Sequence, residues 1–183
     1  MTKRDIDITQ RNWHPTPLVG SIVLVTTVDT DGNLNIAPKS WVSLVSANPF
    51  RVIIGCNHTH HTAINLLSTK ECVLNFPSDD IVKKTWDAHH YLEPCKEEAT
   101  LRGFSTLPSK IVTPSRLVEC RAHIECRFET VHSFGEECIL IVEVVAASVD
   151  EEAFAYEDIY NYLRPIFFIE PKVYGIIEKS HSV

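Results

Sequence analysis

The chain has 183 residues, of which 44% are hydrophobic and 22% charged, and its formal net charge is −7. This length suits one domain with a substantial buried core, and the composition is that of an ordinary globular protein. The acidic balance, without a long Lys/Arg run, argues against nucleic acid as a partner. No segment approaches the ~18 apolar residues of a membrane helix, and the first seven residues lack a secretory signal. We therefore expect a cytoplasmic protein that does not bind a membrane.

In chain order, the strongest local signals are those of β-strands. Residues 21–29 are β-branched and apolar, and a turn follows at Asp31-Gly32. Residues 34–38 then alternate between apolar and polar, which predicts a hairpin. Two further apolar strands are predicted at 51–56 and 71–76, and residues 40–46 form a short mixed segment.

Two short helices are predicted between these strands. Residues 60–69 place Ala63, Ile64, Leu66 and Leu67 on roughly one face. Ser78 followed by two aspartates is typical of a helix N-terminus, and this second helix extends to about residue 88. Residues 91–114 contain three prolines and predict an irregular loop of the kind that often carries function.

The second half of the chain predicts two long strands and little helix. Residues 120–130 alternate strictly, so we expect a polar outer face comprising Arg121, His123, Glu125, Arg127 and Glu129. Residues 137–149 are apolar on both faces, with a hairpin loop at 132–136. A helix at 156–163 and a strand at 172–177 complete the chain. Many strands and few helices predict an all-β fold with a few short helices, closed as an antiparallel barrel.

Several familiar site motifs are absent from the sequence. The six glycines are not spaced as Gly-x-Gly-x-x-Gly, and no Walker loop, Gly-x-Ser-x-Gly or His-Glu-x-x-His occurs. The histidines near residues 58–61 and 89–90 have no Cys or carboxylate at matching spacing, so we expect no metal. The six cysteines include no Cys-x-x-Cys pair, and without a secretory signal free thiols are the better interpretation.

The most informative stretch is a pair of polar clusters at residues 39–48 and 57–62. The first combines Lys39, three serines and Trp41, and the second leads into the predicted first helix. Hydroxyl groups, a cation and a helix N-terminus suit a phosphate, and an aromatic wall suits a flat ring, so the stretch fits flavin mononucleotide (FMN). The alternative is that Trp41 belongs to the core, the serines to turns and the histidines to the surface.

At these residues the sequence resembles the flavin reductase-like, FMN-binding split-barrel family, which includes flavoredoxin-type proteins. The resemblance runs from about His14 to Ile177. It rests on the following segments, in this order: His14-Pro15, Thr26-Thr27-x-Asp29-x-x-Gly32-x-x-Asn35-x-Ala37-Pro38-x-Ser40-Trp41, Ser46-x-Asn48-Pro49, Ile53-x-Gly55, His60-His61-Thr62-x-x-Asn65 and Val73-x-Asn75-x-Pro77-Ser78.

The resemblance implies a six-stranded antiparallel Greek-key split barrel over residues 14–183, preceded by an N-terminal arm at 1–13. It also implies a homodimer with FMN at or near the subunit interface. Carried over by position, the residues that would hold the FMN are Lys39, Ser40, Trp41, Val42, Ser43, Ser46, Ala47, Asn48, Asn57, His58, His61 and Thr62. The first five would lie along the ring, the next three would hold the ribityl chain and phosphate, and the last four would close over the phosphate.

The sequence departs from the family at two places. Pro49 is followed by Phe50 where many members have a second proline, and residues 163–169 replace a His-x-Gly-Gly stretch. Two functions therefore stay open. One is an oxidoreductase that moves reducing equivalents from NAD(P)H through FMN to free flavin or an acceptor protein. The other is a flavoredoxin-like electron carrier or FMN-binding protein without its own NAD(P)H reductase activity.

Overall fold

A computed structural model describes residues 3–5, 18–170 and 172–181 of the chain. Most of the predicted N-terminal arm at 1–13, and the His14-Pro15 pair, lie outside the described residues. None of the helices within the described ranges is long and apolar enough to cross a membrane.

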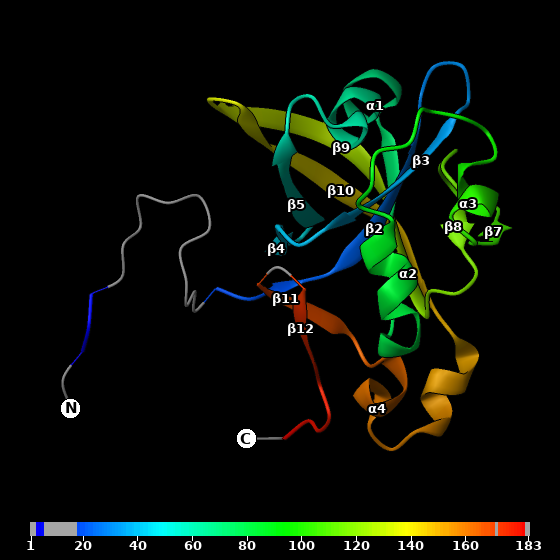
Figure 1. The fold of residues 1–183 in the computed structure, drawn as a ribbon. Helices are drawn as coiled ribbons and strands as arrows, with labels where there is room; N and C mark the ends of the chain where they lie inside the picture. Colours follow the sequence, from blue (N-terminus) through cyan, green and yellow to red (C-terminus); the bar gives the residue numbers. More distant parts are fainter. Residues whose placement is uncertain (1–2, 6–17, 171, 182–183) are drawn as a thin grey trace.

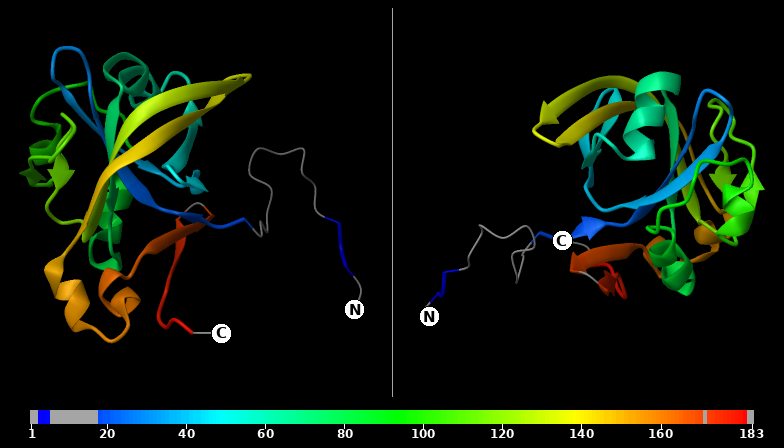
Figure 2. Two further views of the ribbon diagram at one scale, coloured as in Figure 1. Left: turned by 180° about the vertical axis from the view of Figure 1, so that it is seen from behind. Right: turned by 45° about the horizontal axis from the view of Figure 1, so that its top comes forward.

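Seven antiparallel strands form the main sheet, in the order β3-β2-β6-β9-β10-β5-β4. Their bounds are β2 Val23–Val28, β3 Leu34–Lys39, β4 Val42–Ala47, β5 Phe50–Asn57, β6 Glu71–Phe76, β9 Ala122–Phe134 and β10 Glu137–Val149. The two longest strands form a hairpin that extends past the rest of the sheet (Figure 2). The all-β prediction is confirmed, and the sheet has seven strands where the family resemblance implied six.

The connection between β3 and β4 shows that this sheet is rolled into a barrel. These strands lie at opposite edges of the sheet, yet only Ser40 and Trp41 separate them. In a flat seven-stranded sheet the edges would lie about 29 Å apart, at about 4.8 Å per strand. Three extended Cα–Cα steps reach only about 10 Å. The two edges therefore meet, and the N–H of Gly55 on β5 donates to the Trp41 carbonyl at 2.7 Å.

Smaller elements surround the barrel (Figure 1). The helices are α1 His61–Thr69, α2 Val82–Asp87, α3 Glu98–Leu101 and α4 Ile159–Leu163, and short 3₁₀ turns occupy Asp79–Ile81 and Glu151–Ala155. A three-stranded sheet joins β1 Gly20–Ser21, β11 Ile166–Glu170 and β12 Val173–Ile176 in the order β1-β11-β12. β7 Thr106–Leu107 pairs with β8 Arg116–Leu117.

Two apolar clusters form the core. The larger fills the barrel interior with inward residues of β2, β5, β6, β9 and β10 and the buried face of α1. The smaller lies between β3 and the segment that carries α2 and α3, and includes Leu34, Ile36, Phe104 and Leu117. All six cysteines are free thiols, and all but Cys95 are buried.

The predicted buried face of α1 is wrong at Ile64, which is 50% exposed. Thr62 and Asn65 are buried instead, because hydrogen bonds satisfy their polar atoms against the barrel. The Asn65 amide donates to the Thr27 hydroxyl at 3.1 Å, and the Asn35 amide approaches the Thr62 hydroxyl at 3.5 Å. Polar pairing thus places α1 on the strands where apolar spacing alone predicted otherwise.

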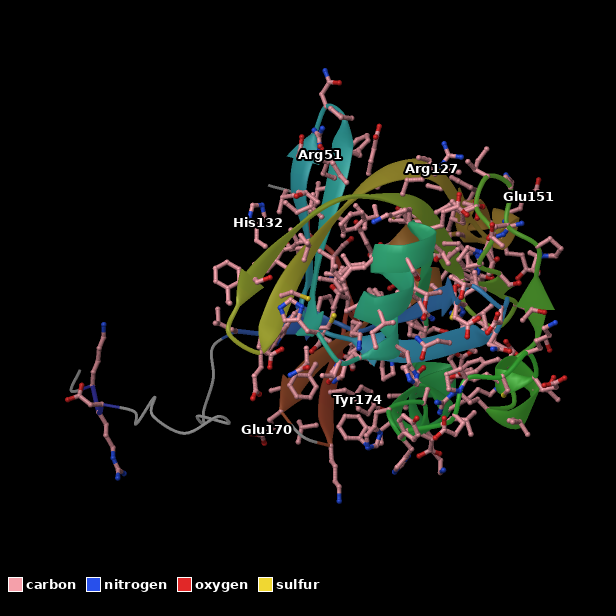
Figure 3. The ribbon with its side chains drawn as sticks, turned by 90° about the horizontal axis from the view of Figure 1, so that it is seen from above. Arg51, Arg127, His132, Glu151, Glu170 and Tyr174 are labelled. Carbon is pink, nitrogen blue, oxygen red and sulfur yellow. The ribbon has the colours of Figure 1, made fainter. Side chains whose placement is uncertain are left out.

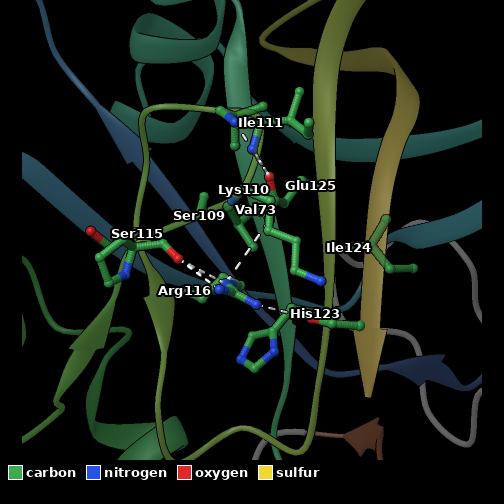
Figure 4. A network of polar contacts seen from close by, with 12 residues as sticks. Val73, Ser109, Lys110, Ile111, Ser115, Arg116, His123, Ile124 and Glu125 are labelled. Carbon is green, nitrogen blue, oxygen red and sulfur yellow. Dashed lines mark hydrogen bonds and ion pairs between the residues drawn. The ribbon is translucent and has the colours of Figure 1, made fainter. Parts of the chain in front are cut away.

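The prediction of a polar outer face on β9 is also wrong in part, because His123 and Glu125 are buried. The loop at 108–117 covers them, and the Glu125 carboxylate accepts the backbone N–H groups of Lys110 at 2.8 Å and Ile111 at 2.7 Å (Figure 4). Burial alone would raise the pKa of Glu125, but the backbone hydrogen bonds outweigh it and the pKa lies below its ordinary value. A charged side chain here fastens a loop to the barrel.

Candidate functional site

A cleft with two lobes opens beside the exit of β3, and we call it the front cleft. Its aromatic lobe, of about 500 Å³, is lined by Ile22, Pro38, Lys39, Ser40, Val82, Lys83, Thr85, Trp86, Asp87, His89, Phe168, Lys172, Val173 and Tyr174. Its basic lobe, of about 420 Å³, is lined by Asn35, Ile36, Ala37, Pro38, Lys39, Thr59, His60, His61, Thr62, Ala88, His89, His90, Tyr91, Leu92 and Arg102. Pro38, Lys39 and His89 border both lobes, so the lobes are continuous.

The crossing from β3 to β4 positions the shared wall of the front cleft. Gly20 on β1 packs so closely on this crossing that a Cβ there would lie 2.0 Å from the Ser40 carbonyl oxygen. On the other side, a Cβ at Gly55 would lie 3.0 Å from the Trp41 side chain. Glycine is required at position 20 because a backbone carbonyl approaches closely, and a side chain at position 55 would press against the Trp41 ring. These contacts hold Lys39 and Ser40 against the cleft.

The basic lobe concentrates groups that carry or acquire positive charge. Lys39, Arg102 and four histidines line it, and no Asp or Glu is among its described lining residues. This contrasts with the net charge of −7 for the whole chain. The Lys39 ammonium lies 3.4 Å from His60 Nδ1, and burial lowers its pKa below the ordinary value. Glu137 acts on this ammonium electrostatically but forms no ion pair with it, so the partly buried cation is suited to an anionic ligand.

The N-terminus of α1 faces the same lobe. In the described part of the chain, the N–H groups of His61 and Thr62 have no backbone acceptor, since the first bonded amide of the helix is that of Ala63. The N-cap residue His60 makes no side-chain capping bond. Free N–H groups and the helix dipole favour an anion at this position, and the lobe adds a second, independent source of positive charge.

The aromatic lobe has a largely apolar wall with one unsatisfied polar atom. Trp86 on α2 lines this lobe together with Phe168 and Tyr174 of the β11–β12 hairpin, and Figure 3 shows Tyr174 on that hairpin. Within the described residues, Thr85 Oγ1 is the one buried side-chain oxygen or nitrogen without a hydrogen-bond partner. An unsatisfied buried hydroxyl costs about 1–3 kcal/mol, and this oxygen lies behind the wall of the lobe, where solvent does not reach it. This lobe suits a flat apolar ring with polar atoms on its edge.

The sequence of residues 17–166 matches the family model described as "Flavin reductase like domain". The chain belongs to the flavin reductase-like family. The Bacillus subtilis protein YwrF is 28% identical over 149 residues, which cover 76% of this chain and 73% of YwrF. Family membership supports a flavin cofactor and a flavin-linked oxidoreductase type of function.

Solved structures of the family share the fold. Flavoredoxin of Desulfovibrio vulgaris (Miyazaki F) superposes with a TM-score of 0.85 at 18% identity, covering 100% of this chain and 97% of that one. A protein with a split barrel domain from Shewanella frigidimarina gives 0.83 at 18% identity, covering 92% and 87%. The flavin reductase-like chain is therefore a split barrel, as the sequence predicted.

Of the residues predicted to hold flavin, Lys39, Ser40, His61 and Thr62 line the front cleft. The remaining predicted residues lie elsewhere. Asn57 binds within its own turn, where its side-chain oxygen accepts the N–H and hydroxyl of Thr59 at 2.9 and 2.8 Å. His58 donates its N–H to the Glu136 carbonyl and does not line the cleft. The other predicted residues of the first polar cluster lie on the edge strand β4 or directly beside it. They are Trp41, Val42, Ser43, Ser46, Ala47 and Asn48.

Sequence reasoning missed several residues of the cleft. No local pattern in the sequence marks Trp86, Thr85 or Arg102 as cleft residues. Phe168 and Tyr174 enter from the C-terminal hairpin, more than a hundred residues from Lys39 in the chain. The three prolines and irregular pattern of 91–114 were the one signal that this segment borders a site. Among the described residues, no three His, Cys, Asp or Glu side chains are grouped to hold a metal ion.

Proposed function

We propose that this chain binds FMN in the front cleft and passes reducing equivalents from NAD(P)H through the flavin to an acceptor. One observation carries the proposal: an apolar, aromatic lobe and a carboxylate-free basic lobe join at Lys39. FMN is a flat ring connected by a ribityl chain to a phosphate, so its two ends match the two lobes. The lobe volumes lie in the range of small-molecule sites.

The residues present fit the group at both ends. In the basic lobe, the Lys39 ammonium and the N–H of His61 at the start of α1 would hold the phosphate. In the aromatic lobe, Trp86 and Phe168 would flank the ring, and Ser40 would lie beside its polar edge.

When bound, flavin accepts a hydride from a nicotinamide and hands electrons to an acceptor. The protein would hold the flavin ring, exclude water from one face of that ring and place positive charge beside the phosphate. No general acid or base is needed for a hydride step. Lys39 and Ser40, at the junction of the lobes, orient the flavin between its two anchors.

A ligand comparison tests this assignment. Titration of the flavin-free protein with FMN and with riboflavin, followed by flavin fluorescence, measures what the phosphate contributes. We expect FMN to bind at least about 10-fold more tightly, since charge-assisted hydrogen bonds contribute about 1.5–3 kcal/mol. Equal affinities would contradict phosphate binding in the basic lobe. Rapid anaerobic bleaching of bound FMN by NADH or NADPH then supports the reductase function.

A flavoredoxin-like carrier is the second candidate, and the C-terminal hairpin favours it. Phe168 and Tyr174 line the aromatic lobe close to the place where the family resemblance predicts a His-x-Gly-Gly stretch. Large side chains at this wall leave less room for a nicotinamide to stack on the ring. A protein that binds FMN tightly but stays yellow with both nicotinamides, and is reduced by a low-potential donor, would be a carrier.

The exposed edge of the sheet supports the proposal of a homodimer. Trp41, Leu44, Val45, Phe50 and Phe134 are each more than half exposed, and all but Phe134 lie on or beside the edge strand β4 (Figure 1). An apolar, unpaired edge strand invites association. A second copy that covers β4 would bury these side chains and bring the predicted residues of β4 near a partner's cleft. The dimer thereby accounts for predicted flavin residues that lie outside the front cleft of their own chain.

A further inference from the structure

A second cavity, which we call the rear cavity, lies on the opposite face of the β1-β11-β12 sheet from the aromatic lobe. Its volume is about 520 Å³, and it is lined by Ser21, Ile22, Phe76, Pro77, Ala122, His123, Ile124, Ala147, Ser148, Val149, Tyr160, Leu163, Pro165, Phe167 and Ile177. Successive side chains of a strand point to opposite faces, and so Phe168 lines the front cleft while Phe167 lines the rear cavity. The two spaces share only Ile22 among their described lining residues.

The wall of the rear cavity carries no formal charge. No Asp, Glu, Lys or Arg is among its described lining residues, and most of its side chains are aliphatic or aromatic. A charged ligand would lose its hydration here without gaining a partner, so the wall selects against FMN phosphate and against nicotinamide nucleotides. A neutral ligand with a mainly apolar body is the class that this wall accommodates.

His123 gives the cavity a hydrogen-bond acceptor. Its Nε2 lies 2.8 Å from the Leu117 carbonyl oxygen, which can only accept, so Nε2 carries the proton and donates. Burial lowers the pKa of His123, which keeps the ring neutral and leaves a lone pair on Nδ1. His123 is 6% exposed and lines the cavity, and none of the described residues donates a hydrogen bond to its Nδ1. This lone pair is the ring's remaining acceptor for a ligand in the cavity.

We propose that the rear cavity is a second small-molecule site, which takes a neutral aromatic ligand bearing one hydrogen-bond donor that reaches His123 Nδ1. Ser148 adds a neighbouring polar group, since its Oγ accepts from the Arg116 guanidinium at 3.3 Å and keeps its own hydrogen for a ligand. Phe76 and Phe167 supply the aromatic wall. This site is independent of flavin, because the two ligands occupy opposite faces of one sheet.

Phenol and anisole are matched probes, since both are neutral and aromatic but only phenol has a donor. Each is titrated into the FMN-saturated full chain, and amide shifts are followed by NMR. We expect saturable shifts at residues 122–124 and 147–149, with phenol binding about 2- to 12-fold more tightly than anisole, as for one neutral hydrogen bond. Ala147→Phe should fill the cavity and weaken phenol binding at least 10-fold, because position 147 is exposed and tolerates a larger side chain.

Ala155→Phe is the matched control, because Ala155 is exposed and lines neither space among the described residues. It should leave phenol binding unchanged. Absence of saturable shifts, equal affinities for phenol and anisole, or displacement of phenol by FMN would overturn the proposal. So would a change of oligomeric state in Ala147→Phe by sedimentation velocity, since a second copy would then be the occupant. A chain that binds phenol but not FMN would refute the flavin site alone.

Discussion

Removing the Lys39 ammonium should weaken FMN binding without weakening the fold. Lys39 borders both lobes of the front cleft, and its nearest polar neighbour among the described residues is His60. Burial lowers the pKa of Lys39, which means that the free protein holds this charge at a cost. Lys39→Met keeps the length and apolar stem of the side chain and removes only the charge, so the melting temperature should stay unchanged or rise.

The size of the effect follows from the contact and its surroundings. A hydrogen bond to a charged group contributes about 1.5–3 kcal/mol, or about 10- to 150-fold in Kd. The α1 N-terminus remains in the basic lobe after the substitution and continues to attract the phosphate, whereas the Arg102 guanidinium is already paired with the buried Glu98 carboxylate at 2.6 Å. We therefore expect a loss near the lower limit, about 10- to 30-fold for FMN, and less than about 2-fold for riboflavin, which lacks the phosphate.

Fluorescence titration at two ionic strengths measures this loss. Lys96→Met is the control, because Lys96 is exposed and lies outside the described lining of the cleft. The wild-type affinity should also fall as pH rises through the pKa of Lys39, which burial places below 10.5, since the ammonium is the form that binds an anion. Lys39→Met should lack that decline. An unchanged FMN affinity, or an equal loss for riboflavin, would refute the assignment of the phosphate to Lys39.

Three further predictions concern association, acid stability and thiol reactivity. Leu44→Lys should convert the proposed dimer into a monomer in sedimentation velocity, whereas Leu101→Lys, at a similarly exposed position on α3, should not; a Leu44→Lys dimer would contradict the proposed β4 interface. Glu125→Gln should cost about 1.5–3 kcal/mol of unfolding free energy at pH 7, because the carboxylate accepts several backbone N–H groups. The pKa of Glu125 is depressed in the folded protein, so the carboxylate's contribution to the unfolding free energy is complete above about pH 4.5 and is lost as the pH falls through the folded-state pKa. Urea unfolding should therefore show a smaller difference in unfolding free energy between wild type and Glu125→Gln at pH 3 than at pH 7. The same difference at both pH values would rule this out. In the native protein a single thiol, that of Cys95, should react rapidly with Ellman's reagent, because the other five cysteines are buried. Burial also raises the pKa of Cys56 to about 12, which keeps that thiol protonated. Two or more rapidly reacting thiols would disprove this account.

Strands with strong local signals were predictable from sequence. The apolar runs at 71–76 and 137–149 coincide with β6 and β10, because β-branched residues between turn signals leave little alternative. Residues 166–170 received no strand assignment, yet they form β11. Their strand depends on pairing with β1 and β12, which lie far from one another in the chain. Long-range pairing, rather than local preference, makes this strand.

The candidate site was predictable only where one local segment contributes several of its groups. Lys39 with Ser40, and His61 with Thr62, were found because each pair lies inside a polar cluster next to a strand or helix end. Trp86 and Tyr174 reach the cleft through tertiary packing, and neither has a distinctive neighbourhood in the sequence. The burial of His123 under the 108–117 loop could not be predicted from the sequence either, because the alternation in β9 indicates that the strand has two faces but not which segment covers each face.

A crystal structure of the FMN-loaded chain tests the central claim most directly. The account predicts that the isoalloxazine lies in the aromatic lobe between α2 and the β11–β12 hairpin. A phosphate oxygen should lie within hydrogen-bond distance of Lys39 Nζ or of the His61 N–H at the start of α1. Flavin bound with its phosphate away from the basic lobe, or a protein that takes up no flavin at all, would contradict it.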